Sequence, residues 1–437
     1  MKVYFDVIGC RLNQSEVEEF SNQFMALGHD IVPTPADADI AIVNTCTVTG
    51  KAAADSRKRL RKAGRDGART VVATGCWASL EPETALKLPG VNRVILNEDK
   101  DILVSKLLNK TNQEIATLTY HRVPLPGDRS RTRAFIKVQE GCDNHCTYCI
   151  TRIARGRSRS RNFSKIQKDI QAAIDGGASE IVLTGVQLGA WGRDFVEPLA
   201  LKDLIKYILT LPIDARVRLS SIEPWDFDTS ILSLWKDERL CRQLHLPLQS
   251  GSDKILRRMG RQITLSTYQF LIDKIRKEIP EIAITTDVIT GFPGESEADF
   301  KATQSALRQI AFAGGHVFTY SPRPGTAAYQ MEGQIALSVA KKRNESLRNI
   351  FAETGHLYRN GFIGRELPVL WEYRQQIENN GWQLSGLTDN YIRVFCKTDL
   401  NLRNKISNVY LTDHAPSGNA LFGEVMNTPQ RPEQSGL

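Results

Sequence analysis

Three cysteines in one short loop are the residues of this chain best suited to chemistry. Cys142, Cys146 and Cys149 lie in the run GCDNHCTYCI, directly after the apolar stretch AFIKV. Three thiolates from one loop can hold three irons of a 4Fe-4S cluster and leave the fourth iron without a protein ligand. Clusters that only carry electrons usually have four cysteine ligands, so an open iron implies that the cluster binds a reactant.

A structural zinc site is the alternative for this loop. Such a site normally closes its tetrahedron with a fourth Cys or His. His145 is the only candidate nearby, and it lies inside the cysteine loop, where chelation would be cramped. We therefore favour the iron-sulfur cluster. The CxxxCxxC spacing resembles the signature of the radical S-adenosylmethionine (SAM) enzymes, in which the amino and carboxylate groups of SAM chelate the open iron.

Composition limits the possible classes of protein. With 437 residues, 41% apolar and 24% charged, the chain can form two or three packed domains, and it has no apolar run long enough to suggest a membrane span. The N-terminus MKVYFDVIGC lacks the features of a signal peptide, so we expect a cytoplasmic protein. In a reducing compartment its eight cysteines are more typical of metal ligands and buried thiols than of disulfides.

The net charge of +8 is concentrated in two basic segments. The first covers residues 51–70, and the second begins just after the cysteine loop. Its members are Arg152, Arg155, Arg157, Arg159, Arg161 and Lys165. A basic segment is often only a solvated face, but beside a reaction centre it indicates phosphate contacts with a nucleic acid.

Cys10, Cys46 and Cys76 form a second group, although 36 and then 30 residues separate them. Each follows a short β-branched run, VYFDVIG, DIAIVNT or TVVATG, and SEVEEFSNQFMALG has the apolar spacing of one helix face. Alternating strands and helices predict a parallel sheet, whose strand-end loops open on one edge. A single free cysteine is commonly a buried thiol. Three at matching strand ends predict a second 4Fe-4S cluster with its own open iron, whereas Cys241 and Cys396 are assigned to no metal.

From residue 134 onward, six apolar runs alternate with helical stretches. The runs are AFIKVQEG, EIVLTGVQLG, RVRLSSIEP, LHLPLQSG, AITTDVITGFPG and GGHVFTYSPRPGT. Six strand and helix units fit a partial parallel barrel, whose active site lies at the C-terminal ends of the strands. The stretch from Gly291 to Gly294 lacks the Lys and Ser/Thr of a nucleotide P-loop, so we predict no ATP site there.

The order of these parts resembles the methylthiotransferases of the radical SAM superfamily over nearly the whole chain. The resemblance implies an α/β fold: a parallel α/β domain with an auxiliary cluster over residues 1–120, a partial (βα)6 radical SAM barrel over 130–355, and a small TRAM-like RNA-binding β-barrel over 360–427. Short strand-like runs and an Asn380-Gly381 pair suited to a tight hairpin favour the last part, although any small β-barrel would show the same pattern.

The resemblance also implies roles for single residues. Cys142, Cys146 and Cys149 would bind the SAM cluster, and Cys10, Cys46 and Cys76 the auxiliary cluster. Tyr148 would pack near the adenine of SAM. Four strand-end residues match positions that contact SAM in this superfamily: Gln187, Glu223, Gln249 and Gly291. In a C-terminal barrel that binds RNA, bases would stack on Trp382 and Tyr391, and phosphates would meet Arg365 and Arg393.

Short motifs indicate the substrate. NTCTVT, GCRLNQSE, RGRSRSR and LSSIEP resemble the branch of the family that acts on N6-threonylcarbamoyladenosine beside the anticodon of tRNA. Some positions depart from that branch: residues 151–153 replace the more usual apolar and proline residues, Gln187 stands where His or Asn is frequent, and Ser79 replaces a glutamine. The same chemistry on N6-isopentenyladenosine in tRNA, or on an aspartate of a ribosomal protein, therefore stays open.

The hypothesis for the reaction follows from the resemblance. One SAM methylates a sulfide at the auxiliary cluster, and a radical from a second SAM removes the hydrogen at C2 of the adenine, where the methylthio group takes its place. The implied partners are the tRNA anticodon loop, whose bases unstack cheaply, an electron donor such as flavodoxin or ferredoxin, and a sulfur donor. A more distant alternative is a non-catalytic, metal-bearing RNA-binding protein.

Overall fold

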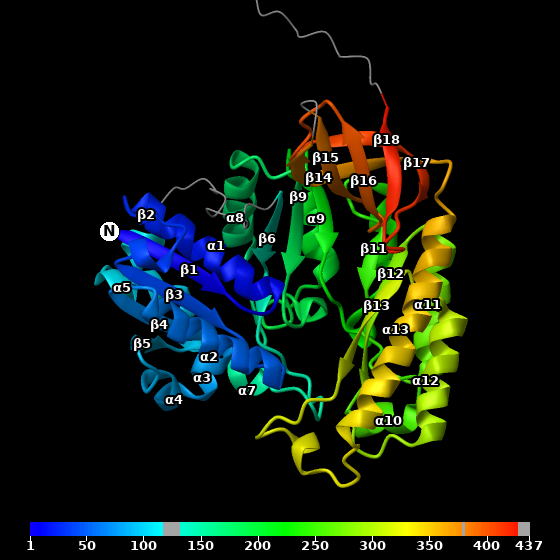
Figure 1. Ribbon diagram of the computed structural model, residues 1–437, viewed down its shortest axis with the longest axis horizontal. Helices are drawn as coiled ribbons and strands as arrows, with labels where there is room; N and C mark the ends of the chain where they lie inside the picture. Colours follow the sequence, from blue (N-terminus) through cyan, green and yellow to red (C-terminus); the bar gives the residue numbers. More distant parts are fainter. Residues whose placement is uncertain (117–131, 378–380, 427–437) are drawn as a thin grey trace, which may run out of the picture.

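The computed structural model describes residues 1–116, 132–377 and 381–426. They form two α/β parts and a C-terminal β-barrel (Figure 1), which confirms the predicted fold class. In the described part of the chain, no helix combines the length and the apolar character needed to cross a bilayer. The expected boundary between the first two domains, residues 121–129, lies outside the described residues, and so does Asn380 of the expected hairpin. The domain boundaries therefore stay a prediction.

The N-terminal part is a five-stranded parallel sheet in the order β2-β1-β3-β4-β5. Ala41 and Val43 of β3 belong to one buried cluster and Ile42 to another, so both faces of the sheet are covered. The strands are β1 (Lys2–Val7), β2 (Asp30–Ile31), β3 (Ile40–Thr45), β4 (Thr70–Gly75) and β5 (Val91–Ile95). The helices are α1 (Arg11–Ala26), α2 (Gly50–Arg65), α3 (Cys76–Leu80), α4 (Pro82–Leu86), α5 (Leu103–Leu108) and α6 (Asn112–Ala116).

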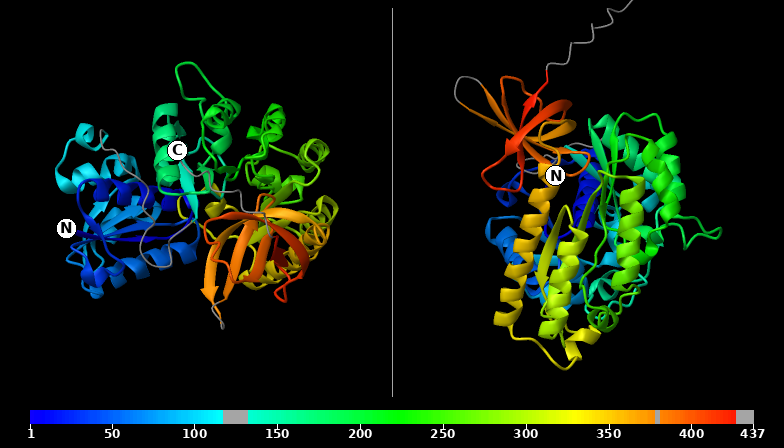
Figure 2. Two further views of the ribbon diagram at one scale, coloured as in Figure 1. Left: turned by 90° about the horizontal axis from the view of Figure 1, so that it is seen from above. Right: turned by 90° about the vertical axis from the view of Figure 1, so that its right-hand side faces the viewer.

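The central part contains the six predicted strands in two parallel sheets, β10-β9-β6 and β11-β12-β13. Bridges from Val217 to Leu240 and from Ser221 to His245 join the two sheets, so the order runs from β6 to β13 around a partial barrel. The strands are β6 (Arg133–Lys137), β9 (Glu180–Thr184), β10 (Arg216–Leu219), β11 (Gln243–His245), β12 (Ala283–Thr290) and β13 (Gly314–Thr319). Helix α1 of the N-terminal part packs against β6, at one edge of this barrel (Figure 2).

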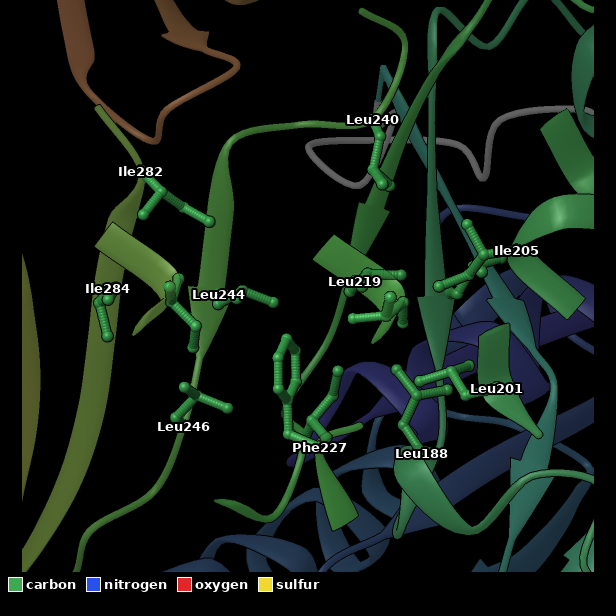
Figure 3. Packing of buried hydrophobic residues seen from close by; sticks show 14 of the residues in the cluster. Leu188, Leu201, Ile205, Leu219, Phe227, Leu240, Leu244, Leu246, Ile282 and Ile284 are labelled. Atoms are coloured by element: carbon green, nitrogen blue, oxygen red, sulfur yellow. The ribbon is translucent and has the colours of Figure 1, made fainter. Parts of the chain in front are cut away.

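Helices cover the outer face of the central strands. They are α8 (Phe163–Asp175), α9 (Leu201–Thr210), α10 (Asp253–Arg258), α11 (Leu265–Glu278), α12 (Glu297–Ile310) and α13 (Leu337–Asn360). The short helix α7 (Thr151–Arg155) follows the cysteine loop. Strands β7 (Gln139–Glu140) and β8 (Arg159–Ser160) form a separate two-stranded sheet. Figure 3 shows Leu219, Leu244 and Phe227 packed in one core with Leu201 and Ile205 of α9. Each fully buried side chain of this size contributes about 1.5–3 kcal/mol of transfer free energy, so the strand ends are held on a rigid frame.

The C-terminal part is a closed barrel in the strand order β14-β15-β16-β18-β17. Closure leaves no unpaired strand edge. Its strands are β14 (Glu366–Gln376), β15 (Trp382–Thr388), β16 (Arg393–Thr398), β17 (Ile406–His414) and β18 (Leu421–Val425). The barrel lies over the N-terminal ends of the central strands, as Figure 1 shows above β9 and β11.

Buried charges attach the C-terminal barrel to the central part. Glu180, at the start of β9, is fully buried and pairs with Arg216 and Arg218 at 2.8 Å each. Arg218 also donates hydrogen bonds to the carbonyl oxygens of Thr388 and Asp389 in the C-terminal barrel. Burial raises the pKa of Glu180, but the guanidiniums of Arg218 and Arg216 outweigh it and lower that pKa to about 2. One buried carboxylate thus pairs with both arginines that hold the barrel.

Replacing Glu180 with Ala should destabilise this attachment. The change leaves Arg216 and Arg218 buried without their carboxylate, which typically costs about 3–5 kcal/mol. We expect a lower urea midpoint and faster protease cleavage between α13 and β14. The carboxylate's contribution is fully present above its unfolded-state pKa of 4.5 and is lost as the pH falls toward 2, so the difference from wild type should shrink over that range. The exposed Glu345 is the matched control; an equal effect of Glu345→Ala would contradict the argument.

Candidate functional site

Two adjoining cavities lie between the N-terminal sheet and the central barrel. The larger, about 640 Å³, is lined by Cys10, Cys46 and Cys76 and by residues of the central strands. The smaller, about 200 Å³, is lined by Tyr148 and Cys149 of the cysteine loop. Four residues line both cavities: Val48, Thr151, Asp287 and Phe318. The two cysteine groups predicted from the sequence therefore open onto neighbouring parts of one interior space.

The start of the cysteine loop is held by a close backbone approach. Gly141 has a φ of 71°, and a Cβ atom there would lie 1.8 Å from the carbonyl oxygen of Arg157. This approach lets the Cys142 amide donate a hydrogen bond to the carbonyl of Gly156 at 3.1 Å. Only glycine fits this position, because any side chain would clash and the left-handed conformation disfavours other residues.

The middle of the loop is held by the C-terminal end of α10 and the residues that follow it. The Thr147 amide donates to the carbonyl of Met259 at 2.9 Å, and the Thr147 hydroxyl donates to that of Arg258 at 2.8 Å. Gly260 allows the loop to approach, since a Cβ there would lie 2.8 Å from the carbonyl oxygen of His145. The loop is therefore positioned by backbone contacts before any ligand binds.

Arg261 is a functional residue that the sequence did not reveal. Its guanidinium is buried, pairs with Glu223 at 2.7 Å and lies over the ring of Trp225 at 4.3 Å. Its Nη1 lies 3.8 Å from the sulfur of Cys146. Burial raises the pKa of the Cys146 thiol, and the charge of Arg261 acts against that rise. No spacing in the sequence connects residue 261 with the cysteine loop.

The second cysteine group converges as predicted. Cys10 follows β1, Cys46 follows β3 and Cys76 follows β4, and these three strands are neighbours in the sheet. Gly9 brings two of the loops together, since a Cβ there would lie 2.6 Å from the sulfur of Cys46. Gly75 does the same at the third loop, where a Cβ would lie 2.4 Å from the carbonyl oxygen of Thr45.

Burial keeps the thiols of Cys46 and Cys142 protonated while they have no ligand. It raises the pKa of Cys46 to about 11 and that of Cys142 to about 12. Nearby cysteines add to the rise in both cases. Iron binds thiolates, so occupation of either site would release protons.

A buried charge network connects the two cysteine groups. Arg155 donates to Asn13 Oδ1 at 2.6 Å and pairs with Glu16 at 2.8 Å and Glu140 at 3.3 Å. Asn13 Oδ1 also lies 3.7 Å from the sulfur of Cys10. Glu140 is the last residue of β7, and this strand ends just before the cysteine loop. The positions of both groups therefore depend on one guanidinium.

This network corrects one prediction from the sequence. The basic segment after the cysteine loop was expected to contact phosphates, but this is wrong for Arg155 and Arg161. Arg161 pairs with Glu19, Asp101 and Asp169 at 2.8–3.2 Å. Carboxylates of the N-terminal part and of α8 thus hold both guanidiniums in place. The basic residues of α2 fit the prediction better, because most of them are exposed: Lys51, Lys58, Arg59, Arg61, Lys62 and Arg65.

Two of the expected SAM contacts line the smaller cavity. Tyr148 is packed edge to face against Phe292, with ring centroids 6.4 Å apart. Gln249 follows β11 and has a φ of 73°, an uncommon conformation for a residue other than glycine. Strained backbone of this kind is often found at binding sites, where the surrounding structure maintains it.

The other three expected contacts interact with other residues of the chain. Gln187 accepts a hydrogen bond from the Asp143 amide and donates one to Asp226, both at 3.0 Å. Glu223 pairs with Arg261. The Gly291 amide donates to Glu295 at 2.8 Å. None of the three lines either cavity, so direct contact with SAM stays a prediction for them.

The donor sets fit a cluster and a polar ligand better than a single metal ion. In residues 1–116, 132–377 and 381–426, no three His, Cys, Asp or Glu side chains are arranged to hold one metal ion, and His145 is exposed. A 4Fe-4S cluster is larger and bridges thiols that stand further apart. Asp287 Oδ1 and the Tyr320 hydroxyl are buried at the smaller cavity without a hydrogen-bond partner among the described residues. They are free to bind a polar ligand.

Two histidines of the larger cavity were also missed. His245 is hydrogen-bonded to Thr285 at 2.9 Å and lies 3.3 Å from Asp287, and its ring centroid is 6.4 Å from that of His316. All four residues line the cavity. The sequence did contain a signal for the two histidines, since they alternate with apolar residues along LHL and HVF.

The C-terminal barrel contributes one residue to the site. Tyr391 lines the larger cavity. Trp382 does not: the guanidinium carbon of Arg374 lies over its ring, 4.9 Å from the ring centroid. The two arginines that were expected to meet phosphates are held by carboxylates: Arg365 pairs with Glu281, and Arg393 pairs with Glu372. Base stacking on Trp382 or Tyr391 stays a prediction.

Replacing Gly141 with Ala should displace the cysteine loop, because the new Cβ would overlap the carbonyl of Arg157. We expect Cys142 to be alkylated several times faster in the cluster-free protein, as measured by mass spectrometry. Gly156→Ala is the matched control, since Gly156 has a similar φ of 75° and nothing within 4 Å of the new Cβ. Equal alkylation rates in the two variants would show that the close approach does not position the loop.

Comparison with known proteins gives a consistent assignment. Residues 136–307 match the radical SAM superfamily, and residues 2–97 match a family described as uncharacterized protein family UPF0004. Threonylcarbamoyladenosine tRNA methylthiotransferase MtaB of Thermotoga maritima is 39% identical over 381 residues, 85% of this chain and 86% of that one. The MtaB of Bacillus subtilis is 33% identical over 420 residues, 93% of each chain.

The chain is also similar to an enzyme of the other tRNA branch and, in fold, to solved structures. The tRNA-2-methylthio-N(6)-dimethylallyladenosine synthase of Fusobacterium nucleatum is 33% identical over 430 residues, 96% of this chain and 98% of that one. Among solved structures, the radical S-adenosylmethionine methyltransferase TsrM of Kitasatospora setae, with cobalamin and a [4Fe-4S] cluster bound, has a TM-score of 0.56 at 14% identity, covering 75% of this chain and 77% of that one. This similarity concerns the fold alone.

Proposed function

This chain belongs to the radical SAM methylthiotransferase family, and we propose that it converts N6-threonylcarbamoyladenosine beside the anticodon of tRNA to the 2-methylthio derivative. The observation that carries the proposal is that Cys10, Cys46 and Cys76 line one cavity and that Cys149 of the cysteine loop lines the adjoining one. A sulfur-inserting enzyme needs two such centres within reach of one substrate. The names of the MtaB relatives support the choice of substrate.

We propose that Cys142, Cys146 and Cys149 hold one 4Fe-4S cluster, with SAM at its open iron. The second cluster is held by Cys10, Cys46 and Cys76. Tyr148 and Gln249 contact SAM from the walls of the smaller cavity. Three residues support the site from behind: Gln187 holds the cysteine loop at Asp143, Glu223 orients Arg261, and Gly291 lets β12 end close to α13.

The protein positions the reactants and excludes water. When bound, the clusters and SAM supply the radical and the sulfur needed to replace an aromatic hydrogen, which is not acidic enough for a general base. Arg261 places a positive charge beside Cys146 and so favours its thiolate. Tyr148, Ile289 and Tyr320 line the smaller cavity and pack against a buried apolar cluster that contains Phe292. The substrate base enters the larger cavity between the two cysteine groups.

The exposed basic residues of α2 fit the tRNA backbone. Helix α2 begins at Gly50, directly after Val48 and Thr49 of the cavity wall. Phosphates bound along α2 would place an unstacked loop base at the cavity entrance. We propose that the enzyme acts on tRNA in the cytoplasm and receives electrons and sulfur from separate donors, such as a flavodoxin or ferredoxin for the electrons.

Single cysteine variants separate the two centres. Cys146→Ala should abolish both SAM cleavage and methylthio product, because the cluster that binds SAM is lost. Cys46→Ala should retain SAM cleavage and lose the product, because only the sulfur-bearing centre is affected.

Iron analysis of the reconstituted proteins should give close to eight irons in the wild type and about four in each variant. Full product formation by Cys46→Ala would refute the two-centre assignment, and Cys241→Ala serves as a control at a buried thiol outside both cavities.

The substrate is tested with purified anticodon stem-loop RNAs. RNA carrying N6-threonylcarbamoyladenosine should give the 2-methylthio nucleoside, detected by mass spectrometry after digestion. RNA carrying N6-isopentenyladenosine should be converted at least about tenfold more slowly, since a pocket built for a polar group rejects an apolar one. Faster conversion of the isopentenyl substrate would assign the enzyme to the other tRNA branch of the family.

A further inference from the structure

The larger cavity carries an excess of positive charge. Its charged lining residues are Arg11, Arg155, Arg359 and Asp287. Arg155 is neutralised by Glu16 and Glu140, and Asp287 lies beside His245. Arg11 and Arg359 pair with no carboxylate of residues 1–116, 132–377 or 381–426. An unpaired guanidinium in a confined space favours an anionic ligand.

Arg11 lies at the end of the cavity that holds the second cysteine group. It follows Cys10 directly, and neither Arg11 nor Tyr391 lines the smaller cavity beside Tyr148 and Cys149. Asp287 lines both cavities and therefore lies toward the other end. Arg11 is thus separated from Asp287 along the cavity, and an anionic group would be drawn to the side of Arg11.

The C-terminal barrel positions Arg11. Its Nη2 donates a hydrogen bond to the hydroxyl of Tyr391 at 3.2 Å, across 380 positions of the chain. The ring of Tyr391 lies over the buried guanidinium of Arg218 at 5.3 Å, and Arg242 pairs with the neighbouring Asp389 at 2.6 Å. Tyr391 therefore occupies a fixed place, and its hydroxyl leaves the remaining donors of Arg11 free for a ligand.

We propose that Arg11, oriented by Tyr391, binds the carboxylate of the threonylcarbamoyl group and so selects this substrate over an N6-isopentenyl one. The inference rests on the proposed function and names the residue that decides its specificity. The threonyl group ends in a carboxylate, which a guanidinium can bind in a bidentate manner. An isopentenyl group would leave the guanidinium desolvated against hydrocarbon, which disfavours binding.

The test compares three anticodon stem-loop RNAs that share the same phosphates. One carries N6-threonylcarbamoyladenosine, the second its methyl ester, and the third unmodified adenosine. Dissociation constants are measured by fluorescence anisotropy with the cluster-reconstituted protein, and product is measured separately. Wild type should bind the free acid roughly tenfold to a hundredfold more tightly than the ester. Arg11→Gln should lose this preference while keeping its affinity for the ester and its iron content.

Two further variants complete the design. Tyr391→Phe removes the hydroxyl that orients Arg11 and should reduce the preference for the acid. Arg61→Gln is the matched control, because Arg61 is exposed on α2 and should affect all three RNAs by the same factor. A preference for the acid that survives Arg11→Gln would overturn the inference, as would an equal loss of affinity for acid and ester.

The wild type by itself also tests the inference, should Arg11→Gln fail to retain its clusters. Equal affinity of wild type for acid and ester would overturn it without any variant. Failure of the proposed function looks different, since wild type would then give no methylthio product from the threonylcarbamoyl RNA. An Arg11-dependent preference for the acid in binding would still establish the carboxylate subsite in that case.

Discussion

One buried guanidinium, that of Arg155, holds the two cysteine groups together. It contacts Asn13 and Glu16 of α1 and Glu140 at the start of the cysteine loop. Burying a charge without a partner is costly, and here Arg155 and Lys100 both pair with Glu16 while Arg155 also pairs with Glu140. The two cations hold the pKa of Glu16 well below its usual range against the effect of burial. The N-terminal sheet therefore has one favourable position against the barrel, and that position places both cysteine groups on adjoining cavities.

Glycine at a few positions makes the close approaches possible. Gly9, Gly75 and Gly141 have positive φ values and face atoms less than 3 Å from where a Cβ would lie. A side chain at any of them would push two loops apart and separate the thiols. The cost is the greater conformational entropy that glycine loses on folding, which the packed sheet and barrel on either side offset.

The site is assembled from all three parts of the chain. The N-terminal sheet supplies one cysteine group and Arg11, the central barrel supplies the other group with Arg261, and the C-terminal barrel supplies Tyr391. The attachment of that third part by Glu180, Arg216 and Arg218 therefore affects the larger cavity as well as stability. A small β-barrel that bound RNA independently would need no such connection.

The sequence by itself determined the elements and the chemistry. Three cysteines in one loop indicated an open iron, and alternating strands and helices placed Cys10, Cys46 and Cys76 at one sheet edge, because local periodicity decides which elements form and parallel strands end together. Only the tertiary structure decided which charged side chains pair with one another. Arg155 and Arg161 resembled a basic surface until carboxylates distant in the chain neutralised them. Arg261 became a site residue only through packing, and Tyr391, expected to stack on RNA bases, lines the larger cavity. Which charged groups meet depends on how distant elements dock, and no local pattern carries that information.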